Sequence, residues 1–287
     1  MLNDTRRNDH DMHHTTGYLR SLRARNSSPT TLRNAHSALT MLERATGRPL
    51  IELEYDDIEQ WVDERLTAVV ARSVRSQLVW VRGFYRWAIE SGHLTNDPTA
   101  RLRTVKVPRL LPRPIAENRL DAALAGADPK MRAILLLAAD GGLRAGEIAG
   151  LEWADVRLDD AEPTLRIIGK GSRERVVDLA PRLVEALAAL PHRRGIVIRR
   201  GDGSAGANTA TRVSQMAGAH LHESGCPDTL HALRHRFGTL VCREGGIRVA
   251  QEALGHASPT STAIYTQIAR REIRSTILAA LGPGNAA

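Results

Sequence analysis

The chain has 287 residues, of which 42% are hydrophobic, 25% charged and 3% aromatic, a globular composition with room for two ordinary domains. No apolar run approaches the roughly 20 residues of a membrane span, and the N-terminus lacks a signal-peptide core, so we expect a cytoplasmic protein. A formal charge of +8 and a pI near 10.2 favour a polyanionic partner, and two cysteines without a CxxC pairing argue against a disulfide scaffold or a zinc site.

Helical periodicity dominates the first hundred residues. Residues 1–13 are polar, and we expect them to form a disordered tail. After the tail, apolar residues recur three and four positions apart, between residues such as Ser28, a typical N-cap, and Gly47, a typical stop. The pattern predicts a compact domain over residues 14–103, with four helices over about 15–25, 29–46, 58–66 and 71–91.

The surface charge changes sign within this domain. Residues 51–64 hold seven acidic side chains and no Lys or Arg, whereas residues 71–113 hold nine basic residues against two acidic ones. A basic helix face can neutralise the phosphates of a nucleic acid, although an ordinary solvated helix face would have the same composition. The candidate DNA-binding residues are Arg75, Arg82, Arg86, Arg101, Arg103 and Lys106.

Prolines punctuate residues 104–114, where Pro108, Pro112 and Pro114 stand among basic residues. Proline removes a backbone donor and restricts helix formation, so this segment reads as an extended linker. We place the domain boundary here and expect a second domain over residues 115–287.

Two features of the second domain suit an anionic ligand. Amphipathic helices are expected near 116–125 and 129–139, and the paired glycines after them permit a tight turn that places Arg144 at the start of a helix. The Arg144 guanidinium and nearby backbone amides could converge there on one anion. Residues 164–179 alternate like a β-hairpin whose glycine-lined tip carries Lys170. Taken singly, Arg144 could be a surface residue and Lys170 a solvated turn lysine.

The last third of the chain gathers further chemical groups. Helices are expected near 181–190, 209–223, 228–243 and 248–254, with a short strand at 195–198. On the third of these helices His231 and Arg234 share a face, and His235 follows one turn after His231. Gly255-His256 then leads to another helix that carries Tyr265. Guanidinium matches phosphate oxygens, imidazole moves protons near neutral pH, and a phenol can be a nucleophile.

Together these stretches resemble the tyrosine recombinase (phage integrase) family. The first family motif has an arginine three residues before a glutamate, as Arg144 and Glu147 stand here, although Ala145 and Gly146 between them are smaller than usual. The second motif is His-x-x-Arg, and the nucleophile follows Leu-Gly-His by nine residues, as Tyr265 does here. The resemblance covers about residues 15–282. It implies a mostly α fold with a small β-sheet, composed of an N-terminal helical core-binding (SAM-like) domain and a C-terminal α+β catalytic domain, without an additional arm-binding domain.

The resemblance also implies a reaction. Arg144 and Arg234 would clamp the non-bridging oxygens of a phosphodiester before and during reaction. Tyr265 would attack phosphorus, form a 3′-phosphotyrosine and expel a 5′-hydroxyl. A phenol has a pKa of about 10, so it must lose its proton during the attack.

Further residues of the chain match the proton-transfer and supporting positions of the family. His231 is the candidate that accepts the phenolic proton, Lys170 the candidate that protonates the leaving oxygen, and His256 would donate a hydrogen bond to the phosphate. Glu147 would orient the site without touching the substrate. His235 either takes part or simply packs.

We expect no cofactor and no metal, and double-stranded DNA as the partner. The implied assembly is a homotetramer on paired sites that exchanges strands through a Holliday junction. A last helix around residues 273–281 would dock on a neighbouring subunit or on its own domain, and the terminal Ala-Ala resembles a bacterial proteolytic tag or is an ordinary tail.

Integration or excision of phage or mobile DNA is the preferred role, and Xer-type resolution of chromosome or plasmid dimers is the alternative. A type IB topoisomerase-like activity and a catalytically idle DNA-binding protein are further readings. Replacing Tyr265 with Phe would separate the enzyme from the binding protein, because binding would survive while covalent attachment is lost.

Overall fold

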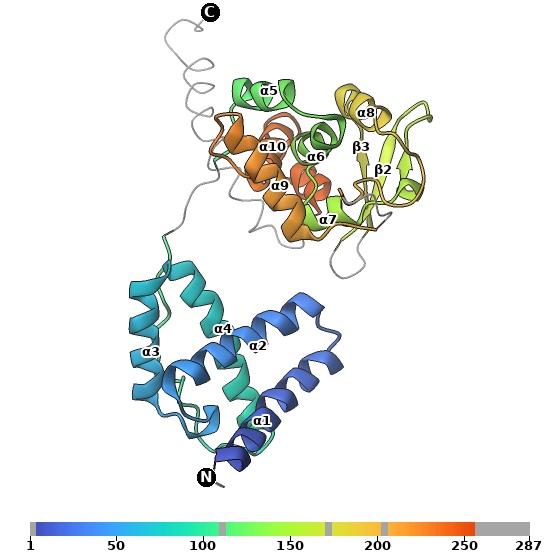
Figure 1. Cartoon of the computed structure of the whole chain (residues 1–287). Helices are drawn as coiled ribbons and strands as arrows, with labels where there is room; N and C mark the ends of the chain where they lie inside the picture. The colour runs from blue at the N-terminus through green and yellow to red at the C-terminus, as the bar shows by residue number, and fades with distance from the viewer. Residues whose placement is uncertain (1–3, 109–112, 170–173, 202–205, 256–287) are drawn as a thin grey trace, which may run out of the picture. The chain divides into compact units, whose positions relative to one another are not determined.

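The computed structural model describes residues 4–108, 113–169, 174–201 and 206–255, with side chains from residue 14 onward. The chain divides between residues 109 and 110, inside the expected linker, into two compact units. Helices dominate both units, and one small sheet lies in the second, which confirms the predicted fold class (Figure 1). Among the described helices, none is both long and apolar enough to cross a membrane.

The regular elements described in the N-terminal unit are all helices. Its elements are α1 (Asp4–Ala24), α2 (Pro29–Thr46), the short 3-10 helix η1 (Leu50–Glu52), α3 (Tyr55–Ala68) and α4 (Ala71–Glu90). Local signals set the ends of α2, where the Ser28 hydroxyl accepts from the Thr31 amide and Gly47 takes a left-handed conformation. Buried aromatic side chains fill the centre, and the Tyr85 hydroxyl donates to the Leu50 carbonyl at 2.7 Å.

The expectation of disorder over residues 1–13 is wrong for residues 4–13, which form the first part of α1. The second half of this helix buries Tyr18, Leu19 and Leu22 in the core of the unit. Once those turns exist, each further helical residue costs little, and neither Pro nor Gly interrupts residues 4–16. Residues 1–3 lie outside the described part.

The C-terminal unit surrounds one central helix, α6 (Pro129–Ala139). Seven consecutive residues of α6, Ala133–Ala139, are buried, because the helix packs against partners on several sides. Those partners are α7 (Ala145–Gly150), α8 (Pro181–Ala188), α9 (Ala210–Glu223) and α10 (Leu230–Leu254). The remaining elements are α5 (Glu117–Ala125), η2 (Trp153–Asp155), β1 (Val156–Arg157), β2 (Thr164–Ile168) and β3 (Glu174–Asp178).

The sheet is antiparallel in the order β1-β2-β3, with Arg166 opposite Val176. Strands β2 and β3 are the predicted hairpin, and its tip at residues 170–173 lies outside the described part. In place of the short strand expected at 195–198, the structure has an isolated bridge from Ile196 to Glu152, and a second bridge joins Arg199, just after this segment, to Ala207. Helix α10 breaks at Gly246, whose φ is 79°, so two helices run there as expected.

Candidate active site

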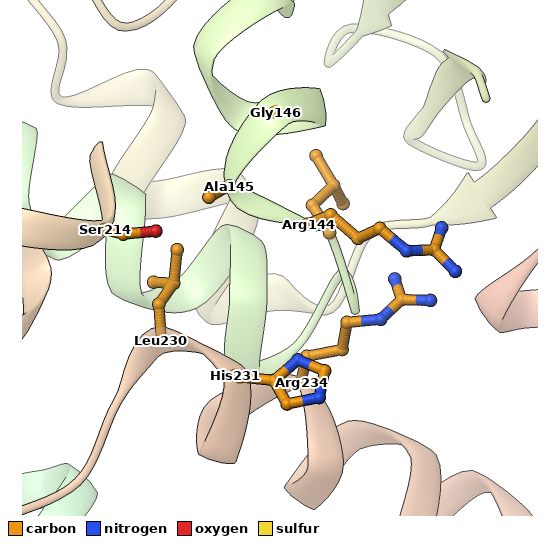
Figure 2. A pocket seen from close by; sticks show the side chains of 8 residues that line it. Arg144, Ala145, Gly146, Ser214, Leu230, His231 and Arg234 are labelled. Atoms are coloured by element: carbon orange, nitrogen blue, oxygen red, sulfur yellow. The ribbon is translucent and has the colours of Figure 1, made fainter. Parts of the chain in front are cut away.

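A cavity of about 290 Å³ opens between the start of α7 and the start of α10. Arg144 is the N-cap residue of α7, and His231 and Arg234 lie on the first turns of α10. Figure 2 shows the guanidinium groups of Arg144 and Arg234 facing each other at one edge of this cavity, with the His231 imidazole beside Arg234. The lining residues are Leu143, Arg144, Ala145, Gly146, Ser214, Leu230, His231 and Arg234.

The turn before α7 depends on a glycine. Gly142 has a φ of 62°, which L side chains rarely adopt, and a Cβ there would overlap the Phe237 ring of α10. The carbonyl of Gly142 also accepts a hydrogen bond from Nη1 of Arg234. Close approach of this turn to α10 therefore brings Arg144 and Arg234, 90 residues apart in sequence, into one site.

Arg234 is one of the largest buried side chains of the chain, with 2% of its surface exposed. Its Nη2 donates to the Leu254 carbonyl at 2.7 Å, so the guanidinium joins the turn before α7 to the last residue of α10. A buried charge needs such partners, because an unsatisfied one would be costly. The geometry fixes this cation in place before any substrate arrives.

Glu147 is the common partner of the arginines. One of its oxygens accepts from the Arg144 backbone amide at 2.9 Å and the other from Arg144 Nη1 at 2.9 Å. Arg175 donates to both oxygens, at 3.0 and 2.8 Å, and Nη1 of Arg234 lies 3.8 Å away. Burial alone would raise the pKa of Glu147, but these hydrogen bonds and the charges of Arg175 and Arg234 outweigh it and hold the pKa at about 2.

Sequence reasoning missed Arg175, whose side chain is 9% exposed. It stands on β3 two residues before the buried Val177, so it faces the interior of the unit. A charged residue at an inward position of an amphipathic strand was the available signal. The partner could not be named from sequence, because Glu147 lies on a different element.

The site is electropositive, and its surroundings disfavour the charged forms of His231 and His235. Three arginines and one carboxylate leave two positive charges around Glu147. Partial burial, then the charges of Arg234 and Arg144, lower the pKa of His231. Burial and the charges of His231 and Arg234 lower the pKa of His235 to about 4. The neutral His231 can therefore accept a proton, beside an anion held by arginines.

The His231 and His235 rings pack edge to face, with centroids 4.2 Å apart. Of the predicted site residues, Arg144, Glu147, His231 and Arg234 lie together. Lys170, His256 and Tyr265 lie outside the described residues. Within the described part of the chain, no three His, Cys, Asp or Glu side chains are grouped so that they could hold a metal ion.

The predicted DNA-binding residues of the N-terminal unit differ in their surroundings. Most of them are exposed, namely Arg75, Arg86, Arg101, Arg103 and Lys106. Arg82 is half-buried and donates to the Leu102 carbonyl at 2.7 Å, so it also holds the segment after α4. The Arg101 guanidinium lies 4.8 Å from the centre of the Tyr55 ring.

Two family descriptions and a relative of known name match nearly the whole chain. Residues 115–272 match the phage integrase family, and residues 11–92 match the phage integrase N-terminal SAM-like domain. The tyrosine recombinase XerC of Methylobacterium sp. (strain 4-46) is 35% identical, over 90% of this chain and 89% of the relative.

Two solved structures share the fold. One is a lambda integrase tetramer bound to a Holliday junction, with a TM-score of 0.71 and 21% identity over 91% of this chain and 82% of that one. The other is the XerH site-specific recombinase bound to a palindromic difH substrate in a post-cleavage complex, with a TM-score of 0.70 and 18% identity over 89% of this chain and 81% of that one.

Proposed function

The chain belongs to the phage integrase family and is a tyrosine site-specific recombinase, and we propose that its catalytic residues are Arg144, Lys170, His231, Arg234, His256 and Tyr265. The observation that carries this proposal is the convergence of Arg144 and Arg234 on one cavity, where both contact the Glu147 carboxylate, whose side chain is 9% exposed. Cations fixed in this way suit the charge that develops on a phosphodiester during displacement.

The reaction follows from the groups assigned. Arg144 and Arg234 hold the non-bridging oxygens while the Tyr265 oxygen attacks phosphorus. A bond from the phenolic oxygen to phosphorus forms and the bond from phosphorus to the 5′ oxygen breaks. His231, neutral near pH 7, takes the phenolic proton, and Lys170 gives a proton to the leaving oxygen. His256 donates a hydrogen bond to the phosphate.

The covalent intermediate allows strand exchange without a cofactor. The phosphotyrosine conserves the bond energy, so a 5′-hydroxyl from a second duplex can reverse the reaction and reseal the strand. A solved lambda integrase is a tetramer on a Holliday junction, and we propose a homotetramer on paired DNA sites for this chain too. The helix expected around residues 273–281 would then dock on a neighbouring subunit or on its own domain.

The sequence favours integration or excision of phage or mobile DNA, with Xer-type dimer resolution as the alternative. The relative at 35% identity is named XerC, and this favours the Xer-type role. A plasmid with two direct copies of the recognition site tests the choice. Deletion of the segment between identical sites supports the Xer-type role, whereas a requirement for two different sites supports integration.

Covalent trapping tests the chemistry. The purified protein is incubated with nicked duplex fragments of the source genome, and SDS-resistant adducts are collected and sequenced. We expect an adduct with the wild type and none with Tyr265→Phe, which should still bind the fragments. Tight DNA binding without an adduct would support a DNA-binding protein and contradict the proposed enzyme. Relaxation of supercoiled DNA without strand exchange would favour a topoisomerase-like activity.

A further inference from the structure

Arg175 occupies a position where an apolar residue would be expected. It lies on β3 on the same face as the buried Val177, and it exposes only 9% of its side chain. A buried ion pair contributes little stability compared with well-packed apolar side chains, because both charges must leave water. Its presence at this position therefore suggests a task other than stabilising the hairpin.

The contacts of Arg175 point to that task. Its two terminal nitrogens hold both oxygens of Glu147 in the bidentate geometry that fixes a carboxylate most strictly. The same oxygens accept from Arg144 and lie close to Arg234. Glu147 thus contacts both of the predicted phosphate-binding arginines, and Arg175 orients this carboxylate.

A second contact joins Arg175 to the end of α10. A Cβ on Gly255 would lie 3.0 Å from Cδ of Arg175, so the arginine stem packs against this residue. Gly255 ends α10 in a left-handed conformation, directly after Leu254, whose carbonyl holds Arg234. Arg175 therefore supports Arg234 from two directions, through Glu147 and through the end of α10.

We propose that Arg175 is a positioning residue of the recombinase, which fixes Glu147 and, through it, the guanidinium groups of Arg144 and Arg234. The inference rests on the proposed function, which assigns those two arginines to the phosphate. Without Arg175 the carboxylate loses two of its hydrogen bonds, and the exposed Arg144 loses a fixed partner. Glu147 then stays buried, which disfavours its ionised form, but it loses the Arg175 hydrogen bonds, which are the contacts that favour this form most.

The first experiment measures adduct formation in a single turnover, across pH 5–8, with the nicked duplex recovered by covalent trapping. Full-length Arg175→Gln and Arg175→Lys are compared with the wild type. The matched control is Arg166→Gln, because Arg166 forms ion pairs on the outer face of the same hairpin and does not contact Glu147.

We expect Arg175→Gln to form adduct about 100-fold more slowly with unchanged DNA affinity, the loss that a small misplacement of catalytic groups produces. The loss should deepen toward low pH as Glu147 takes up a proton, and adding Glu147→Gln should remove this pH dependence. Arg175→Lys should recover part of the rate, and Arg166→Gln should react like the wild type. A wild-type rate in Arg175→Gln, or a loss that is the same at every pH and is not rescued by Lys, would overturn the proposal.

A second experiment needs no DNA. Carboxyl NMR of the full-length protein follows the ionisation of Glu147, identified by its absence in Glu147→Gln. The Glu147 carboxyl should stay ionised down to about pH 2 in the wild type and titrate at clearly higher pH in Arg175→Gln. An unchanged titration would refute the role of Arg175, whereas a wild type that forms no adduct with any fragment would refute only the proposed function.

Discussion

Glu147→Gln removes the negative charge that Arg144, Arg175 and Arg234 share, and it leaves Arg175 and Arg234 close together without this charge. The pKa of this carboxylate is lowered from 4.5 to about 2 in the folded protein. At 1.36 kcal/mol per pKa unit, this shift corresponds to about 3 kcal/mol of stability at neutral pH. Removing one partner of a buried pair costs a similar ~3–5 kcal/mol. The contact with Arg144, whose side chain is 45% exposed, adds little because water screens it.

Thermal unfolding of the full-length protein measures this effect. We expect the transition of the C-terminal unit to fall by roughly 6–12 °C at pH 7 in Glu147→Gln, the shift that about 3 kcal/mol produces in a unit of this size. Glu162→Gln is the control, because Glu162 is exposed. A glutamine keeps one acceptor oxygen, so the smaller end of the range is expected.

The pH dependence gives the prediction a second, independent test. The folded pKa of Glu147 lies below its unfolded value, so the carboxylate stabilises the fold above about pH 4.5 and this stabilisation is lost as the pH falls toward 2. The difference between wild type and Glu147→Gln should therefore shrink through that window. A variant as stable as the wild type at pH 7, or a difference that does not change with pH, would refute the reasoning.

Three further predictions concern the turn, the proton acceptor and the DNA-binding face. Gly142→Ala should lower the free energy of unfolding by about 2 kcal/mol, because the φ of Gly142 is positive and the added methyl meets an aromatic ring. Gly150→Ala, which has open space around it, should leave thermal unfolding unchanged, and equal effects of the two variants would contradict this. As the pH is lowered, the rate of adduct formation should fall only below pH 6.5, because the pKa of His231 is lowered from its ordinary value. A fall in the rate with its midpoint above pH 6.5 would exclude His231 as the proton acceptor. Arg86→Ala should reduce the slope of log K for DNA binding against log salt by about 0.9, and an unchanged slope would exclude Arg86 from the proposed DNA-binding face. Arg82→Ala should reduce this slope too and should also destabilise its unit by ~1 kcal/mol, because the hydrogen bond to the Leu102 carbonyl is lost.

The helices could be predicted because their signals are local. Ser28 and Gly47 mark the ends of α2 in the sequence, and both act in the structure as those residue types usually do. The start of α1 could not be predicted, because residues 4–13 are polar and their helix continues from turns that pack in the core. Polarity alone does not distinguish a disordered tail from the outer end of a packed helix.

The sequence indicates candidate site residues and their spacings, but not how these residues are arranged in space. Arg144 and Glu147 are three residues apart on one helix start, so their pairing follows from local geometry. The contact of Arg234 with Gly142, and that of Arg175 with Glu147, join elements that are distant in the sequence. Such contacts depend on how α10 and β3 pack around α6 and α7, and no local pattern encodes them.

The contrast between the two proposed catalytic arginines explains how one site can be both rigid and accessible. Arg234 is buried and fully engaged with backbone carbonyls and Glu147, so its orientation is fixed by folding and no reorganisation is needed when charge develops on the phosphate. Arg144 shares the same carboxylate, but 45% of its side chain is exposed, so a duplex could meet it at the cavity. Glu147 is the element that makes this division possible, because a single buried anion offsets the mutual repulsion of the arginines while leaving the centre positive. The same contacts therefore position the two arginines and stabilise the C-terminal unit. A change at Glu147 should affect both the rate of the proposed reaction and the stability of this unit.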